Sequence, residues 1–341
     1  MMKKNSDSGD GSVDRREFLK RLAINGGLAA GAVATGYLFH SGGLTIRNNA
    51  DDSTVYGSTF PLSPERVAAE SSVPGILAVA KGSDPGGITR QAIEALGGMG
   101  QFVSQGDRVL LKPNIGWDRR PKFAANTNPH VVAAIASMCF EAGASKVVVT
   151  DSPCNNPDRC FDKSGLKRAL SGMDVQLLIP NDRDYAEKNL GGEALGVWPV
   201  LRAALDSDRI INIPIAKHHS SAVLSMGMKN WFGILGGGVR RGRLHQQMDR
   251  VIAELAEAVR PTLTVLDAYR ILFRNGPQGG SLMDTKKPET IIASTDPVAV
   301  DAYGTRLFDL SPADVPYIGM AEEMSLGVSD TDSLENIVVG G

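Results

Sequence analysis

Short apolar runs alternate with amphipathic stretches along the chain from residue 75 onward. The apolar runs predict strands at 75–81, 108–112, 146–150, 175–179, 209–213, 263–266, 290–293 and 336–339. The stretches between them predict helices at 88–96, 129–142, 198–205, 244–259, 297–308 and 315–324. Strands that are apolar on both faces and alternate with helices predict an α/β fold, a mostly parallel sheet with helices on both faces.

One segment, residues 208–238, departs from this pattern after its strand. The apolar run 209–213 ends at Pro214, and a segment crowded with polar side chains and glycines follows. Its candidate functional residues are Lys217, His218, His219, Lys229 and Asn230. Neighbouring side chains of an extended chain point to opposite sides, so at most one of the two histidines can face a site.

Polar residues also follow the other predicted strands. They are Lys112 and Asn114, Asp151 and Ser152, Asn212, Asp267, and the run from Ser294 to Asp296. The carboxyl ends of parallel strands share one edge of a sheet, where ligands commonly bind. We therefore predict a site at that edge.

Three of the polar residues also have structural interpretations. Asp296 and Asn128 each precede a proline that can begin a helix. For Asp296, helix capping and ligand binding are equal alternatives, and for Asn128 helix capping is favoured. Asp301 falls among apolar residues of a predicted helix, where a carboxylate needs a partner such as Arg306 or a ligand.

The N-terminus carries the most specific local signal. Arg15 and Arg16 lie in the run DRREFLK, and a weakly apolar, Gly- and Ala-rich stretch follows up to residue 39. This pattern resembles a twin-arginine signal and predicts export by the twin-arginine translocation machinery to the periplasm or another extracytoplasmic location. Cleavage of the signal and its retention as a membrane anchor both stay open. We expect a signal or anchor (1–40), a linker (41–74) and a single α/β domain (75–341).

Charge and cysteine content narrow the function classes. The net charge of −2 argues against a nucleic-acid partner. Three cysteines without a C-x-x-C spacing cannot supply four thiolates, so an iron–sulfur cluster within this chain is not expected, and other cofactors are unknown. Cys154 and Cys160 either form a disulfide or remain free thiols.

Several motifs together resemble a known family. The runs LLKPNIG, VVVTDSP, IINIPIAKHH, SMGMKNWFG, LTVLDAY and IIASTDPVAVDAYGTRL are similar to the uncharacterised family called domain of unknown function number 362, over about residues 109–327. The resemblance implies site residues at Lys112, Asn114, Asp151, Lys217, His218, Lys229, Asn230, Asp267, Ser294, Asp296 and Asp301. The chain lacks the ferredoxin-like module of some members and has Cys154 where a small residue is expected.

Two functions fit these residues. The first is an enzyme for a small anionic substrate, with a positive cleft lined by lysines and arginines, including Arg240 and Arg241, and with Lys217, His218, Asp151 and Asp267 as catalytic groups. The second is a non-catalytic accessory protein that carries a cofactor or metal for an exported redox enzyme. Its metal form would combine His218 with Asp151, Asp267 or Asp296. No P-loop, G-x-G-x-x-G or G-x-S-x-G motif points to another chemistry.

Overall fold

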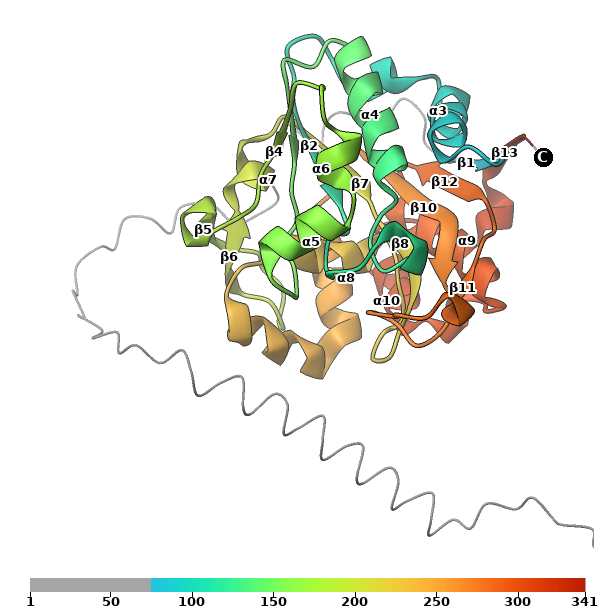
Figure 1. Ribbon diagram of the computed structural model, residues 1–341. Helices are drawn as coiled ribbons and strands as arrows, with labels where there is room; N and C mark the ends of the chain where they lie inside the picture. The colour runs from blue at the N-terminus through green and yellow to red at the C-terminus, as the bar shows by residue number, and fades with distance from the viewer. Residues whose placement is uncertain (1–74, 341) are drawn as a thin grey trace, which may run out of the picture. The chain divides into compact units, whose positions relative to one another are not determined.

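A long mixed sheet organises the described part of the chain, residues 75–340 of the computed structural model (Figure 1). Its main path has the strand order β13-β1-β12-β10-β7-β2-β3-β4. The strands are β1 (Ile76–Lys81), β2 (Arg108–Pro113), β3 (Lys146–Val149), β4 (Val175–Leu177), β7 (Arg209–Ile213), β10 (Leu263–Leu272), β12 (Thr290–Ser294) and β13 (Glu335–Val339). The predicted export signal and linker lie outside the described residues.

Seven of these strands run in one direction. The pairs from β10 through β7, β2 and β3 to β4 are parallel, and β13 is parallel to β1. Strand β12 is antiparallel to both of its neighbours, β1 and β10. The predicted mostly parallel α/β fold is confirmed, and the reversed strand decides which polar residues can share an edge.

Apolar side chains fill both faces of the sheet. In β2, Val109 and Leu111 belong to one buried cluster and Leu110 to the other, as the two-residue period of a strand requires. On the Val109 side lie α3 (Pro85–Ala95) and α4 (Pro129–Glu141), which pack against each other (Figure 1). On the opposite side lie α8 (Met248–Ala258), α9 (Pro297–Thr305) and α10 (Pro316–Glu323). Shorter helices are α5 (Pro157–Lys163), α6 (Leu166–Ala169) and α7 (Arg202–Asp206).

The two capping predictions agree with the helix starts. The Asn128 side chain accepts a hydrogen bond from the His130 N–H ahead of α4, and that of Asp296 accepts one from Ala299 at the start of α9. Each cap satisfies a backbone N–H that the first helical turn leaves without a partner.

One helix prediction in the middle of the chain is wrong at its start. The polar stretch after residue 181 contains β5 (Tyr185–Asn189), and the residues predicted to begin a helix at 198 form β6 (Val197–Leu201), its antiparallel partner. Two valines, a tryptophan and Pro199 favour an extended chain in β6, so the helix begins only at α7.

The segment after β7 is more regular than predicted. It forms β8 (Ile215–His219), which continues along β10, and the short β9 (Val223–Ser225). Two 3₁₀ segments follow, η4 (Met228–Ile234) and η5 (Gly238–Gln247), and α8 begins only after them. Strand β11 (Thr285–Lys286) pairs with the far end of β10. Within residues 75–340, no helix combines the length and apolar character needed to cross a membrane.

Candidate active site

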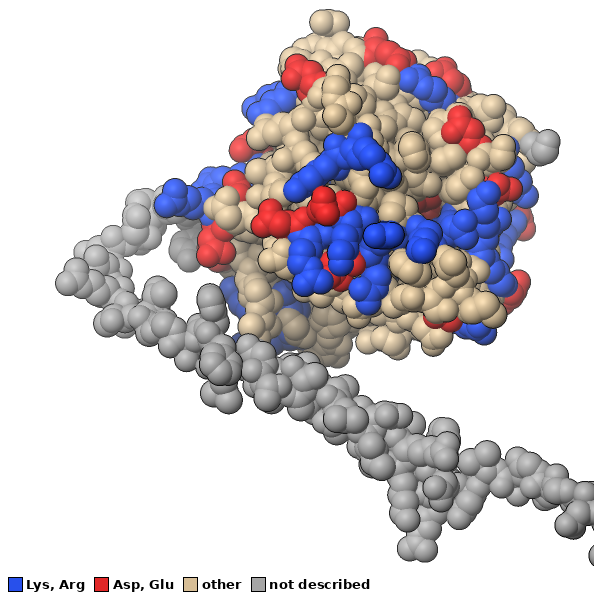
Figure 2. Space-filling model, in the orientation of Figure 1, with Lys and Arg blue, Asp and Glu red and all other residues tan. Residues whose placement is uncertain are grey.

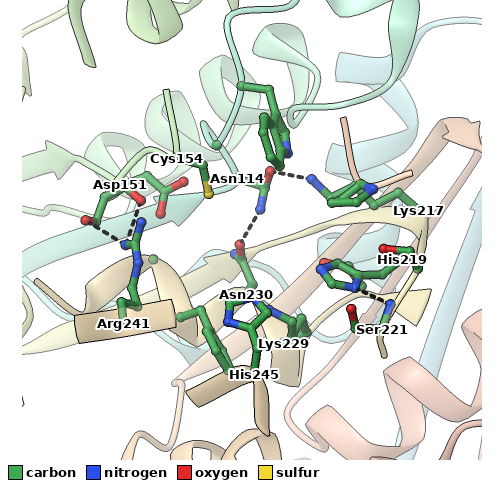
Figure 3. Close-up of a pocket in the computed structure, with 18 residues that line it drawn as sticks. Asn114, Asp151, Cys154, Lys217, His219, Ser221, Lys229, Asn230, Arg241 and His245 are labelled. Carbon is green, nitrogen blue, oxygen red and sulfur yellow. Dashed lines mark hydrogen bonds between the residues drawn. The ribbon is translucent and has the colours of Figure 1, made fainter. Parts of the chain in front are cut away.

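A cavity of about 290 Å³ lies where β2, β3 and β8 end beside η4 and η5 (Figure 3). Its lining includes Asn114, Trp117, Asp151, Ser152, Cys154, Lys217, His219, Lys229, Asn230, Phe232, Gly233, Arg241 and His245. The lining has more basic than acidic side chains. Asp151 is its one carboxylate, and Lys112 Nζ lies 2.7 Å from Asp151 Oδ1. The charged side chains of the lining are therefore mainly basic.

The Lys112–Asp151 ion pair is fully buried at the base of the cavity. Asp151 Oδ2 also accepts a hydrogen bond from the Ile115 N–H, and Lys112 Nζ donates to Asn230 Oδ1 at 2.9 Å. Both groups press against Gly233, where an added Cβ would lie 1.8 Å from Asp151 Oδ1 and 2.5 Å from Lys112 Nζ. Only glycine permits this close approach. The charges of Lys112 and Asp151 are thus neutralised within the protein.

A chain of side-chain amides runs from the cavity into the protein. Lys217 Nζ donates to Asn114 Oδ1, Asn114 Nδ2 donates to Asn230 Oδ1, and Asn230 Nδ2 donates to Asn212 Oδ1. Asn212 Nδ2 then donates to the Gly227 carbonyl. Three predicted site residues, Lys217, Asn114 and Asn230, are thereby brought together.

Lys217 is buried and lacks a carboxylate partner in the described structure. Its Nζ donates to Asn114 Oδ1 at 2.9 Å and to the Ala125 carbonyl at 2.8 Å. Burial lowers the pKa of Lys217 to about 8. Its amine therefore changes charge close to neutral pH.

Lys229 is the most isolated charge of the cavity. Its residue is 8 % exposed, and its Nζ lies 3.6 Å from the centre of the Phe232 ring. Among residues 75–340 the Lys229 ammonium has no ion pair and no hydrogen bond, and its one polar interaction is with that ring. Burial is the main cause that lowers the pKa of Lys229 to about 7, and the charges of Lys217 and Arg241 act in the same direction. Within the described residues, no carboxylate balances the charge of this buried amine.

The structure selects His219 rather than the predicted His218. Lys217 and His219 are two residues apart in β8 and both line the cavity, whereas His218 points away and its Nδ1 accepts the Gly276 N–H. His219 Nδ1 accepts the N–H groups of Ser221 and Ala222, and burial lowers its pKa to about 3. His219 is thus neutral, with its remaining ring nitrogen as a hydrogen-bond donor.

Segment η5 adds two side chains to the cavity. Arg241 donates to Ser152 and to the Leu235 and Pro153 carbonyls, all of them uncharged acceptors. His245, which was not among the predicted site residues, lines the cavity and packs edge-on against Phe232. The helix predicted at 244–259 begins only at Met248. His245 therefore lies outside it, and helical periodicity does not give the direction of its side chain.

Asp267 does not join this cavity. It lies within β10 rather than after its end, because that strand continues to Leu272. Its carboxylate accepts the N–H groups of Asn128 and Tyr269 and lines a separate cavity of about 100 Å³. Burial raises the pKa of Asp267 to about 7. The geometry gives it the role of holding the start of α4.

Ser294 and Asp296 lie at the opposite edge of the sheet, which corrects their predicted place. Ser294 pairs with Thr264 near the start of β10, since β12 is antiparallel. Ser294 donates to the Ile76 carbonyl, and Asp296 accepts from Ala299 and Val328. Both residues hold backbone there.

Asp301 supports the cavity from behind. It lies in α9 with no exposed surface, and its two oxygens accept the N–H groups of Gly227 and Met228. Burial raises the pKa of Asp301 to about 7. Its partner is thus the backbone that leads into η4, neither Arg306 nor Lys229.

The predicted metal set is not assembled. Within residues 75–340, no three side chains of histidine, cysteine, aspartate or glutamate form a group that could hold a metal ion. His218, Asp151 and Asp267 each face different partners. Cys154 and Cys160 are free thiols, Cys154 exposed at the cavity and Cys160 buried in α5.

Comparison with known proteins identifies the family. A thylakoid-associated protein of Synechocystis sp. is 33% identical over 244 residues, which cover 70% of this chain and 74% of that protein. The lactate racemase apoprotein from Thermoanaerobacterium thermosaccharolyticum aligns with a TM-score of 0.41 and 14% identity over 69% of this chain and 57% of that structure. The profile named domain of unknown function (DUF362) matches residues 109–306, and the chain belongs to that family.

Proposed function

We propose that the protein is an enzyme that binds a small anionic molecule, a carboxylate or a phosphate, in the cavity of Lys217 and Lys229. The observation that carries the proposal is Lys229, an ammonium 8 % exposed with no carboxylate partner in the described structure. Burial of a charge without a counter-charge costs roughly several kcal/mol of desolvation free energy. Binding of an anion beside Lys229 would offset that cost.

The charge around the cavity supports the same conclusion. Lys217 and Arg241 donate only to neutral oxygens. Next to the cavity residue Trp117, Asp118 forms ion pairs with Arg119, Arg159 and Lys163, so basic side chains outnumber the acidic one there. Figure 2 shows that lysines and arginines gather on one face of the molecule. Such a distribution attracts anions toward the cavity.

The two lysines also support a reaction rather than binding alone. With pKa values of about 7 and about 8, Lys229 and Lys217 can each give or take a proton near neutral pH. Neutral His219 adds a hydrogen-bond donor that can stabilise negative charge on a reacting oxygen. We assign acid–base catalysis to the lysines and charge stabilisation to His219.

Thermal unfolding with and without phosphate and small carboxylates tests the binding site. We expect these anions to stabilise the wild-type protein and to have no such effect on Lys229→Met. Lys286→Met is a matched control, because Lys286 also lies over an aromatic ring, Phe273, but is half exposed and paired with Asp309. Undiminished stabilisation of Lys229→Met would contradict the proposal.

The pH dependence of binding gives a second measurement. Bound anion favours the protonated lysines, so affinity should be highest below pH 7 and should fall as the pH rises past the pKa values of about 7 and about 8. A carboxylate ligand keeps its charge between about pH 6 and 9, so the change can be assigned to the protein. Titration calorimetry in two buffers would measure the accompanying proton uptake.

Turnover separates an enzyme from an accessory binding protein. Each stabilising anion is incubated with the protein in deuterated water and followed by NMR. We expect chemical change or hydrogen exchange for at least one anion, with loss of that activity in Lys229→Met. Binding without any change across the panel would favour the accessory protein.

We also propose export through the twin-arginine pathway, on the Arg15-Arg16 motif and the apolar stretch that follows. Replacement of both arginines by lysine should leave the protein in the cytoplasm, as fractionation and immunoblotting would show. Export of that variant in a strain without other routes would contradict the assignment.

A further inference from the structure

Cys154 is a thiol at the cavity that the proposed acid–base chemistry does not use. It follows β3 in the turn Ser152-Pro153-Cys154, where its N–H donates to the Gly116 carbonyl at 2.9 Å. Its residue is exposed and lines the cavity, and Figure 3 shows the sulfur directed toward the middle of the site, beside Asn114. The other two cysteines are buried.

The cavity that Cys154 lines has mainly basic side chains around it. Lys217, Lys229 and Arg241 line the same cavity, and the single lining carboxylate, Asp151, is paired with Lys112. These basic side chains attract an anionic reagent or substrate toward the thiol.

Lys229 supplies an independent indication that a ligand enters beside this thiol. The ammonium is more than nine-tenths buried, lines the cavity and has neither an ion pair nor a hydrogen bond in the part of the chain that the structure describes. An anion that neutralises Lys229 would share the cavity with Cys154. A nucleophile and an anion anchor are thus available to one small molecule.

We propose that Cys154 is the nucleophile of this cavity and that its substrate class is a small carbonyl compound bearing a carboxylate or phosphate. The inference rests on the proposed anion site. The thiolate sulfur adds to the carbonyl carbon, and the π electron pair moves to the carbonyl oxygen. That oxygen takes a proton from an ammonium of the cavity, which leaves a neutral amine and a thiohemiacetal. No oxidant or reductant is needed.

Alkylation with two reagents of different charge tests the nucleophile. Full-length protein at pH 7 is treated with iodoacetate or iodoacetamide, and the Cys154 peptide is quantified by mass spectrometry with glutathione as the reference thiol. We expect Cys154 to prefer the anionic reagent by about tenfold relative to glutathione, because the cavity concentrates anions. Phosphate should slow the labelling. Cys139 and Cys160 should stay unlabelled while the protein is folded.

Two variants and one carbonyl pair complete the test. Lys229→Met should lose the preference for iodoacetate, and Cys154→Ser should lose the label. Glyoxylate, an anionic aldehyde, should protect Cys154 reversibly at lower concentration than neutral glycolaldehyde does. Protection by phosphate needs no variant, so a Lys229→Met protein that fails to fold leaves the test intact.

The opposing results are distinct. Labelling of Cys154 with the same reagent preference as glutathione, or equal protection by the two aldehydes, would overturn the nucleophile. If phosphate still stabilised the wild-type protein against thermal unfolding, the proposed anion site would stand and only the nucleophile would be rejected. Loss of both effects would overturn the proposed function as well.

Discussion

Two buried lysines on neighbouring parts of the cavity have opposite surroundings. Lys112 has a carboxylate at 2.7 Å, an amide oxygen of Asn230 and its own strand's Pro113 carbonyl. Lys229 has the face of the Phe232 ring. Both ammonium groups are removed from water, yet only Lys112 has its charge balanced by the protein. Lys112 is thus part of an internal ion pair, whereas Lys229 has no counter-charge among the described residues.

Removal of the counter-charge of Lys112 should have the largest effect. Asp151→Asn leaves a buried ammonium without its carboxylate and should lower the free energy of unfolding by about 3 kcal/mol or more. Urea denaturation measures the change. Glu141→Gln, which breaks an exposed ion pair with Arg90, is the control and should change little. Equal effects of the two substitutions would remove the basis of the comparison.

Lys229→Met should act in the opposite direction, with a pH dependence. The pKa of Lys229 is about 7 when folded and 10.5 as the unperturbed value. Between those values the unfolded chain holds a proton that the folded protein has released, so wild-type stability falls as the pH drops from 10.5 to 7 and then levels. The free energy of unfolding of Lys229→Met should not change with pH in this range. At neutral pH it should exceed that of the wild-type protein by up to about 4 kcal/mol. A loss of stability would indicate an internal partner.

Gly233→Ala should disturb the Lys112 side selectively. The added methyl group would collide with the ion pair and should lower the free energy of unfolding by about 1–3 kcal/mol, as overpacking does. Gly100→Ala is the matched control, since nothing lies within 4 Å of its added Cβ. Thermal denaturation of both proteins measures the difference. If Gly233→Ala were as stable as its control, the ion pair would not depend on this close approach.

Lys217 is an intermediate case, with neutral partners only. Lys217→Met removes a desolvated charge but leaves Asn114 Oδ1 and the Ala125 carbonyl without a donor, so we expect a net loss of about 1 kcal/mol at pH 7. The stability difference between Lys217→Met and the wild-type protein should change with pH between about 8 and 10.5. Chemical denaturation at pH 7 and pH 9 checks both statements. A loss as large as that of Asp151→Asn would place Lys217 with Lys112.

The pattern of hydrophobic residues correctly predicted those strands and helices that depend mainly on their own sequence. Strands β2, β3 and β7 and helix α4 were found because their apolar runs and their caps are local features. Strand direction is not local. The reversed β12 separates Ser294 and Asp296 from the cavity, and no residue within that strand signals its direction.

The site was predicted in part. Lys112, Asn114, Asp151, Lys217, Lys229 and Asn230 meet at one edge of the sheet. The alternation of side chains in β8 would have selected His219 once Lys217 was placed, but the segment carried no signal of an extended strand. Arg241 reaches the cavity through η5, whose irregular backbone follows no period that a sequence shows.

The amide chain from Lys217 to Gly227 has one direction. Each of the three amides accepts a hydrogen bond from the group before it and donates one to the group after it, in the order Asn114, Asn230, Asn212. Rotation of one amide by 180° would place donor against donor on one side and acceptor against acceptor on the other. Aligned hydrogen bonds polarise one another, and loss of the proton on Lys217 would weaken the bonds that follow it. Gly227 in turn donates to Asp301 in α9. An unbroken path of hydrogen bonds, all donated in one direction, therefore joins the Lys217 amine to the backbone segment that Asp301 of α9 holds in place.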